Sequence, residues 1–247
     1  MTNENAQDNV NKIPNHHEWY SILAIWFFSL DPLEQRPKEP PEALYRSFHI
    51  TAKCRYNASI RLDRIGSFSF LTATILSLGL IFVPMIQLSD IPLAYPERVI
   101  NSLQIFFAVA VLIYTVINSA AHFETRAKSL NECGDNIKDL SRKLRSEIYN
   151  AQGQGTVLDF QPINEMYSRI SSASENHSRA DYELAMLQAS DLYHVTGFPR
   201  LWLNIKVFYG NLEGYIFPII LILAEVIVIL DILSVTHVLT GIFNHPN

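Results

Sequence analysis

The sequence of 247 residues lacks the short motifs by which many enzymes are known. It contains no GxGxxG, Walker A loop, HExxH, GxSxG or CxxC, and no paired zinc ligands at the usual spacing. It has only nine glycines, and the GQG at 153–155 is better explained as a turn than as a phosphate-binding loop. We therefore expect a protein that is not an enzyme and that needs neither a metal nor another cofactor.

Cysteine and positive charge are also scarce. Cys54 and Cys133 are far apart, so they provide no disulfide framework and fit a reducing, cytosolic compartment. The net charge of −5 argues against direct nucleic-acid binding through a basic surface. The polar, acidic start of the chain lacks the basic residues and the apolar run of a secretory signal.

Long apolar runs without charge are what the sequence does have. Residues 65–88 and 99–121 contain no Asp, Glu, Lys or Arg, and each is long enough for a helix to cross the hydrocarbon core, which takes roughly 20 residues. The segment between them holds two prolines and is expected to form a short external loop. A soluble domain of this size seldom buries two such helices, so the pair predicts a transmembrane hairpin over 65–121.

A third apolar segment, 215–243, contains two acids, Glu225 and Asp231. Its 19 Ile, Leu, Val and Phe residues favour insertion by roughly 6 to 11 kcal/mol, against a cost of about 5 to 7 kcal/mol for two central carboxylates. The balance predicts a third membrane helix, and a helix lying against the bundle or the interface is the alternative. The two acids project about 120° apart, so each is either part of an ion route or a protonated partner of a neighbouring helix.

The segments outside the spans have distinct compositions. Residues 1–41 are polar and rich in proline, with an apolar run at 21–30 that is too short to span and is expected at the interface. Residues 42–64 predict a cytosolic helix that continues into the first span. Basic residues flank the hairpin on both outer sides, whereas the loop holds only Arg98, which places the N-terminus and the region 122–210 in the cytoplasm.

The region 122–210 contains two apolar seams with helical spacing, from Leu130 to Ile148 and from Ile163 to Leu187. The sequence AQGQG at 151–155 separates them. The pattern predicts two amphipathic helices that form an antiparallel cytosolic hairpin, although pairing of each helix with another subunit fits it equally.

Two polar pairs lie within the second seam. His177 and Asp181 are one helical turn apart, without a third metal ligand nearby, and are predicted to form a hydrogen-bonded pair. Glu175 and Arg179 are placed to form an ion pair between positions i and i+4.

Polar side chains also lie inside the predicted spans. In the second span they fall, with Ala108, within about 60° of one line on a helical wheel. Ser67, Thr74 and Ser77 of the first span lie within about 80° of each other and are candidates for the same seam. The candidates are Asn101, Gln104, Thr115 and Asn118, with Thr74 and Ser77. Such a stripe serves either close packing and hydrogen bonding between helices or the lining of a water-filled path between subunits.

Parts of the chain resemble the SLATT-type proteins, which are small bacterial membrane effectors with a two-helix transmembrane hairpin. The resemblance rests on TAKCRYNASIRLDRIGSFS at 51–69, on the span–loop–span arrangement and on the helix predicted at 122–148. Tyr167, followed by Glu175-Asn176-His177 and Asp181-Tyr182, is similar to a downstream element of one branch of that family. The third apolar segment departs from a simple two-span description.

The resemblance implies an effector of a bacterial antiphage defence system that forms a homo-oligomer and permeabilises or depolarises the inner membrane when triggered. It also implies a nucleotide-signalling or reverse-transcriptase-based sensor as the partner. On this reading the polar stripe contributes to the path, and Asn176, His177 and Asp181 are candidates for coupling the cytosolic region to the spans. An ion channel or transporter subunit using Glu225 and Asp231, and a membrane-anchored scaffold, remain as alternatives.

In each case the expected fold is an all-α membrane protein, with a transmembrane hairpin, extended cytosolic helices and a third C-terminal membrane helix embedded in the lipid bilayer.

Overall fold

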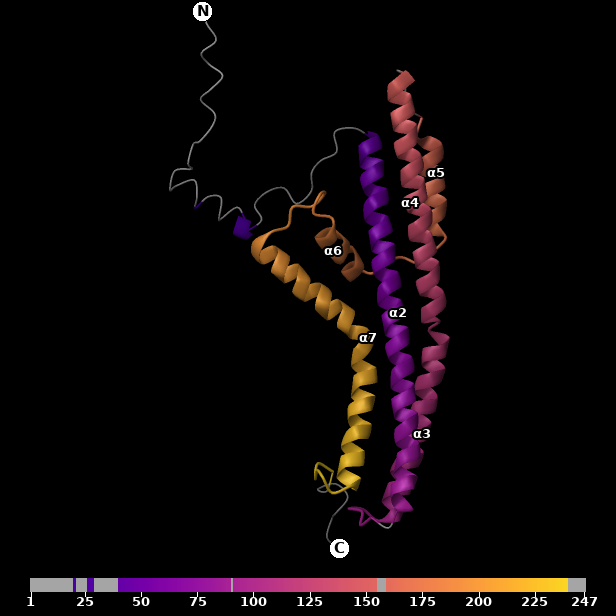
Figure 1. Cartoon of the computed structure of the whole chain (residues 1–247), viewed down its shortest axis with the longest axis vertical. Helices are drawn as coiled ribbons and strands as arrows, with labels where there is room; N and C mark the ends of the chain where they lie inside the picture. Colours follow the sequence, from indigo (N-terminus) through magenta and orange to yellow (C-terminus); the bar gives the residue numbers. More distant parts are fainter. Residues whose placement is uncertain (1–19, 21–25, 29–39, 90, 155–158, 240–247) are drawn as a thin grey trace, which may run out of the picture.

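The computed structural model describes residues 20, 26–28, 40–89, 91–154 and 159–239. These residues form helices and the turns between them, with no strand in the described ranges. Figure 1 shows the helices in chain order: α2 (Pro40–Gln87), α3 (Glu97–Ala120), α4 (Phe123–Gln154), α5 (Gln161–Ser172), α6 (Arg179–Gln188) and α7 (Gly197–Ile232). The polar segment 1–19 and most of the apolar run 21–30 lie outside the described residues.

Three stretches are long and apolar enough to cross a membrane: α2, the α3–α4 stretch and α7. This confirms the expected all-α membrane protein. We call the end of the bundle that holds α4, α5 and α6 the junction side, and the end that holds the α2–α3 loop the loop side.

Helix α2 is a single uninterrupted helix of 48 residues, about 72 Å long. It begins at Pro40, which is tolerated in a first turn because its nitrogen has no hydrogen to leave unbonded. Glu42 in that turn accepts a hydrogen bond from Arg46 at 2.7 Å. The same helix therefore carries the basic segment before residue 65 and the apolar segment after it.

The second arm of the hairpin runs back along α2. Helices α3 and α4 are separated only by Ala121 and His122, and His122 has a positive φ of 48°. The seam of α4 packs on α2, with Ile137 and Leu140 in the same buried cluster as Phe48 and Ala52. The seam that begins at Leu130 therefore packs mainly against α2, and not mainly against the following helix as predicted.

The second predicted amphipathic helix is two helices. The seam from Ile163 to Leu187 breaks after Ser172, and α6 begins at Arg179. The physical reason is a capping box: the Ser178 hydroxyl accepts a bond from the Asp181 backbone, and the Asp181 carboxylate accepts one from the Ser178 backbone. Helix α5 packs on α4 and α2 through Ile163, whereas α6 packs on α2 and α7.

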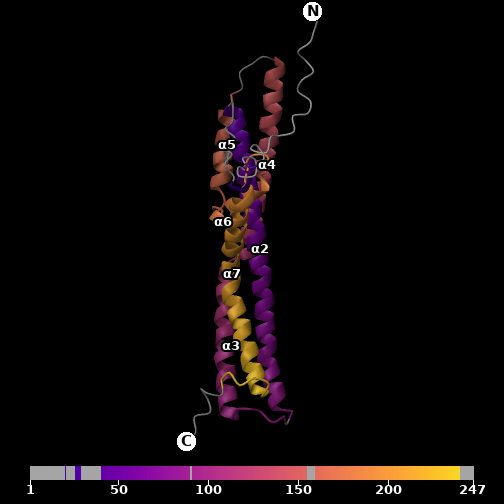
Figure 2. The ribbon, with the colours of Figure 1, turned by 90° about the vertical axis from the view of Figure 1, so that its left-hand side faces the viewer.

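Helix α7 packs against α2 and α3 in its second half, and Figure 2 shows it lying across both. It bends midway (Figure 1), and its interior contains Pro218, which has no backbone hydrogen to bond one turn earlier. Gly214 brings α7 close to α2, since a Cβ there would lie 2.6 Å from Ile65 Cδ1.

The third apolar helix begins and ends earlier than the predicted 215–243. It starts at Gly197 and stops at Ile232, where Ser234 takes a positive φ of 61°. The reason is Asp231, whose carboxylate accepts hydrogen bonds from the backbone nitrogens of Val238 and Leu239 and so turns the following segment back. Residues 240–243 of the prediction lie outside the described ranges.

Candidate functional site

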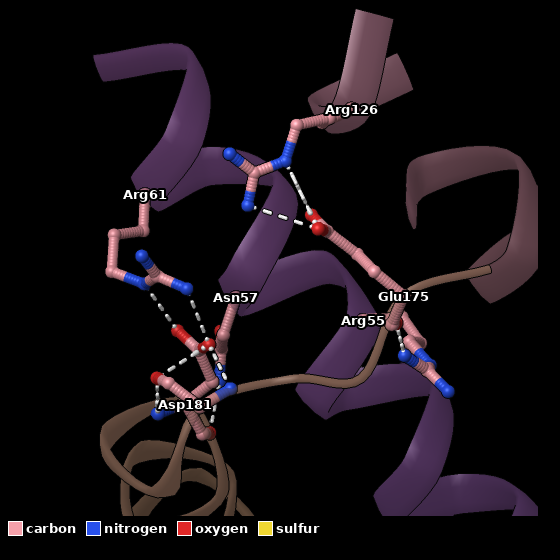
Figure 3. Close-up of polar contacts among 7 residues, drawn as sticks. Arg55, Asn57, Arg61, Arg126, Glu175 and Asp181 are labelled. Carbon is pink, nitrogen blue, oxygen red and sulfur yellow. Dashed lines mark hydrogen bonds and ion pairs between the residues drawn. The ribbon is translucent and has the colours of Figure 1, made fainter. Parts of the chain in front are cut away.

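Polar side chains gather on the junction side, where α2 meets the segment between α5 and α6 (Figure 3). We call this group the junction cluster. It comprises Arg55, Asn57 and Arg61 of α2, Arg126 of α4, Glu175 of the α5–α6 connection, and Ser178 and Asp181 at the start of α6. Residues about 120 positions apart in the chain therefore meet through hydrogen bonds and ion pairs.

Asp181 is the centre of the cluster, and its side chain is 2% exposed. Arg61 binds it with two nearly parallel bonds, Nε to Oδ1 at 3.0 Å and Nη2 to Oδ2 at 2.9 Å. The Ser178 hydroxyl donates to Oδ2 at 2.7 Å. Burial alone would raise the pKa of Asp181, but the hydrogen bonds from Arg61 and Ser178 lower it, so the carboxylate is charged.

Asn57 extends the same contact. Its amide nitrogen donates to the Asp181 backbone carbonyl at 3.3 Å and to Gln188 Oε1 at 3.2 Å. Asn57 and Arg61 are four residues apart on one face of α2, so together they hold both ends of α6.

Arg55 is 2% exposed and holds the end of α5. Its guanidinium donates to the carbonyls of Ser171, at 3.0 Å, and of Glu175. Carbonyls at a helix C-terminus carry partial negative charge and have no partner within the helix, so a buried arginine is well placed there.

Arg126, in the first turn of α4, pairs with the side chain of Glu175 at 2.9 Å. Both side chains are partly exposed, at 43% and 37%, so this pair contributes less than the Arg61–Asp181 pair. The predicted pairing of Glu175 with Arg179 is wrong: Arg179 pairs with Glu183, because the helix that would align it with Glu175 begins only after Ser178.

Glu183 connects α6 to α7. Its side chain is 8% exposed and accepts hydrogen bonds from Arg179 of its own helix and from Lys206 of α7. The start of α6 is thus bound to α2, and its middle to α7.

His177 and Asn176, two of the three predicted coupling residues, lie beside the cluster. The predicted His177–Asp181 hydrogen bond is absent, since the His177 Nδ1 atom is buried without a partner and its ring stacks on Tyr182. Burial and the nearby charge of Arg55 lower the pKa of His177 and keep it neutral. Asn176 is exposed. Of the three, only Asp181 lies within the cluster.

The sequence predictions named none of the three arginines as site residues. Two signals were available. Asn57 and Arg61 form a polar pair at helical spacing just before an apolar span, and Ser178-x-x-Asp181 is the pattern of a helix start. Neither signal says that the two segments meet, because that follows from the way α6 folds onto α2.

Two of the three amide residues in the predicted stripe bond within the hairpin. Gln104 donates to the Leu80 carbonyl at 3.2 Å, and Asn101 accepts from Gln87 at 3.1 Å. Asn118 faces a groove near the junction side that Asp63 and Ser67 also line, and its Oδ1 atom is buried without a partner. Gln104 and Asn118 line different cavities.

The hydroxyl groups of the stripe bond to their own helices. Thr115 donates to Leu112, Thr74 to Phe70, and Ser77 to Ala73. Thr74 and Ser77 are exposed. The structure therefore does not bring them to the seam where Gln104 lies.

Glu225 lies inside the three-helix bundle, 4% exposed, and makes no hydrogen bond or ion pair with any residue the structure describes. It rests against Gly79, where an added Cβ would lie 2.3 Å from Glu225 Oε1. A cavity of about 10 Å³ separates it from α3 and is lined by Gln104, which is close to the space that one water molecule needs.

Asp231 has a different role from the ion route considered for it. It is fully buried at the loop side and accepts hydrogen bonds from Tyr95 Oη at 3.0 Å, from Thr236, and from the backbone nitrogens of Val238 and Leu239. With Ala94 bonding to Ile232, these contacts fasten the α2–α3 loop to the end of α7. We call this group the loop cluster.

Comparison with known protein families assigns the chain to one of them. Neither the curated proteins nor the solved structures contain a significant match. The family described as "SMODS and SLOG-associating 2TM effector domain family 5" matches residues 37–235, which include every helix from α2 to α7. Since the match covers well over half of the chain and agrees with the resemblance noted in the sequence, the protein belongs to this family of membrane effector domains.

Proposed function

We propose that the protein is an effector of a bacterial antiphage defence system that permeabilises the inner membrane, and that the junction cluster holds it in its resting state. The proposal includes a homo-oligomer, a junction side in the cytoplasm, and a separate nucleotide-signalling or reverse-transcriptase-based sensor as partner. The protein itself would neither catalyse a reaction nor bind nucleic acid directly.

The observation that carries the proposal is that Arg61, the partner of Asp181, lies on the same continuous helix as the first span. Arg61 lies four residues before the apolar part of α2, and no break in α2 separates the two. A helix is stiff, so a displacement of α6 that breaks this pair would shift or rotate the membrane part of α2. Charge-assisted contacts between remote segments suit such a switch, because a partner that competes for them changes the arrangement.

The packing of the spans supports a path that forms only after rearrangement. Around Glu225 and Gln104 the three helices leave a cavity of only about 10 Å³. A single resting chain thus has no open route there. Movement of α2 relative to α3 would free Gln104 from the Leu80 carbonyl and Asn101 from Gln87, so that their amides line a path between subunits.

Membrane potential in infected cells tests the proposal. The full chain and its genomic neighbours would be expressed in a bacterial host carrying a potential-sensitive dye and challenged with phage. We expect depolarisation soon after infection, and none in cells without the chain. Protection against phage with an unchanged membrane potential would refute permeabilisation and favour the scaffold alternative.

A second candidate function is an ion channel or transporter subunit that uses Glu225. The observation that favours it is a buried carboxylate without a described partner at membrane depth. Ion flux through the resting protein, lost in Glu225→Gln, with no depolarisation after infection, would support this function over the first. Asp231 is left out of this candidate function, because its carboxylate is already occupied by the hydrogen bonds that hold the loop cluster together.

A further inference from the structure

The first half of α7 exposes a row of large apolar side chains on one face. On a helix with 100° per residue they fall within about 120° of each other. Their exposed fractions range from 41% to 67%. They are Phe198, Leu201, Trp202, Ile205, Phe208 and Tyr209.

The same face continues into the second half of α7, because residues 18 positions apart point in the same direction. Ile216 lies five turns after Phe198, and Ile220 and Leu223 follow on the same side, all exposed. The opposite face, with Val207 and Glu225, is buried against the rest of the protein. The row is therefore continuous with the surface that α7 presents to lipid.

The depth of the first half follows from Gly214. This residue lies beside Ile65, the first residue of the charge-free part of α2. From Gly214 to Ile232 the helix is about 27 Å long, which nearly fills a hydrocarbon core of about 30 Å. Residues 198–209 therefore lie just outside the hydrocarbon, on the junction side.

The bend of α7 and a second segment keep this row near the bilayer surface. Beyond the bend the first half slants away from α2, whereas a straight helix would continue along it (Figure 1). At its outer end it meets Trp26–Phe28, since Thr196 Oγ1 donates to the Trp26 carbonyl at 2.7 Å and Gly197 contacts the Phe27 backbone. Trp26, Phe27 and Phe28 are themselves 49% to 59% exposed.

From this arrangement we infer that residues 198–209 and Trp26–Phe28 form a lipid-binding surface in the headgroup layer of the leaflet on the junction side. Tryptophan and tyrosine are the side chains that favour this layer. Arg200 and Asn204 are exposed beside the row, between it and the buried face, as are polar residues of helices that lie in an interface. Because α7 binds α6 through Lys206 and Glu183, lipid packing would act on the junction cluster.

Quenching of tryptophan fluorescence by brominated lipid tests this inference without requiring permeabilisation. The chain has three tryptophans, so Trp19→Phe with Trp26→Phe leaves Trp202 as the one emitter. The full chain would be placed in vesicles of phosphatidylethanolamine and phosphatidylglycerol, with phosphatidylcholine brominated either near the headgroup or near the chain end. We expect strong quenching by the shallow bromine and about half as much by the deep one.

Two control variants, each with all three native tryptophans replaced by Phe, calibrate the measurement. Phe106→Trp, exposed on α3 within the span, is expected to respond most to the deep bromine, and Tyr149→Trp, exposed near the end of α4, to neither. If Trp202 behaved like Tyr149→Trp and were open to acrylamide, water would cover the row. If neither brominated lipid nor acrylamide quenched Trp202, a second protein copy would cover the row. Either result would overturn the inference, whereas failure of Phe106→Trp would instead refute the membrane assignment.

Discussion

Two buried aspartates, Asp181 and Asp231, lie at opposite ends of the bundle and are held in different ways. Asp181 binds a cation, Arg61, from a helix 120 residues earlier in the chain. Asp231 accepts only neutral donors, two of them backbone nitrogens within eight residues of it. Both aspartates connect remote elements, since Asp231 also accepts from Tyr95 of the α2–α3 loop. Loss of Arg61 leaves a buried charge unpaired, whereas Asp231 loses only one of several neutral donors when a single contact breaks. We therefore assign the proposed switch to the junction side.

The largest expected effect comes from removing one partner of the Arg61–Asp181 pair. Arg61→Gln leaves a buried carboxylate without its cation and should destabilise the junction side by about 3 kcal/mol. Asp181→Asn should do so to a similar extent. Hydrogen exchange of the α6 backbone amides in lipid nanodiscs measures the change.

The exposed pair of Arg142 and Asp139, whose side chains are 69% and 65% exposed, provides the matched control. Arg142→Gln should change stability by less than about 0.5 kcal/mol. Faster exchange in α6 after Arg142→Gln, or none after Arg61→Gln, would contradict the importance given to the buried pair.

Asp231→Asn should have the next largest effect, about 2 kcal/mol, confined to the loop side. An amide nitrogen cannot accept the hydrogen bonds from Val238 and Leu239, so one of those donors loses its partner. The backbone amides of 233–239 should then exchange faster while those of α6 stay protected. Equal loss of protection at both ends would mean that the two clusters form one cooperative unit.

A smaller effect is expected from Gly79→Ala, about 1 to 2 kcal/mol, because the new methyl group would meet the Glu225 carboxylate. Glu225→Ala in the same chain should restore most of the loss, by removing the group that clashes. Thermal unfolding in detergent measures both. Gly153→Ala, with nothing within 4 Å of an added Cβ, is the control and should not destabilise the protein.

The smallest effect concerns pH. Because the pKa of His177 is lowered from 6.5, its neutral form stabilises the fold above pH 6.5, and this contribution is lost as the pH falls through the lowered pKa. Asp181 behaves differently: its pKa is lowered from 3.8, so its contribution persists until the pH falls below 3.8.

His177→Phe, which keeps a ring beside Tyr182, should reduce the loss of stability in mild acid by less than about 1 kcal/mol. The unfolding temperature on either side of pH 6.5 measures it. The pH dependence of stability that remains in this variant should come from His49, whose pKa is also lowered by burial. An unchanged pH dependence would show that His177 is not buried in solution.

The sequence predicted the hairpin and its long helices because apolar runs and helical periodicity are local properties. It failed where a side chain bonds nearby backbone and ends or starts a helix within an apolar pattern. The seam from Ile163 to Leu187 has a helical spacing throughout, but the capping box at Ser178 starts a new helix and turns it onto α2. The helix ending at Ile232 stops inside an apolar run, because Asp231 bonds the backbone that follows it.

The candidate site was predicted only in part, and for a physical reason. Asp181 was named because it lies one helical turn from His177 and because its segment resembles the family. Arg55 was not named, because an arginine on a basic helix is expected to face solvent, and only the fold brings the end of α5 against it. Glu225 and Asp231 look alike in sequence, because both are acids in an apolar run. Only the fold shows that Asp231 accepts from four donors and that Glu225 has no described partner.

Ion flux in reconstituted vesicles most directly tests whether the junction cluster holds the resting state. Vesicles containing wild-type protein, Asp181→Asn or Asp231→Asn would be loaded with a potential-sensitive dye. We predict that Asp181→Asn dissipates an imposed potential without a trigger, whereas wild-type and Asp231→Asn maintain it. An Asp181→Asn protein that is folded and inserted but maintains the potential, or an equal leak from both variants, would contradict the account.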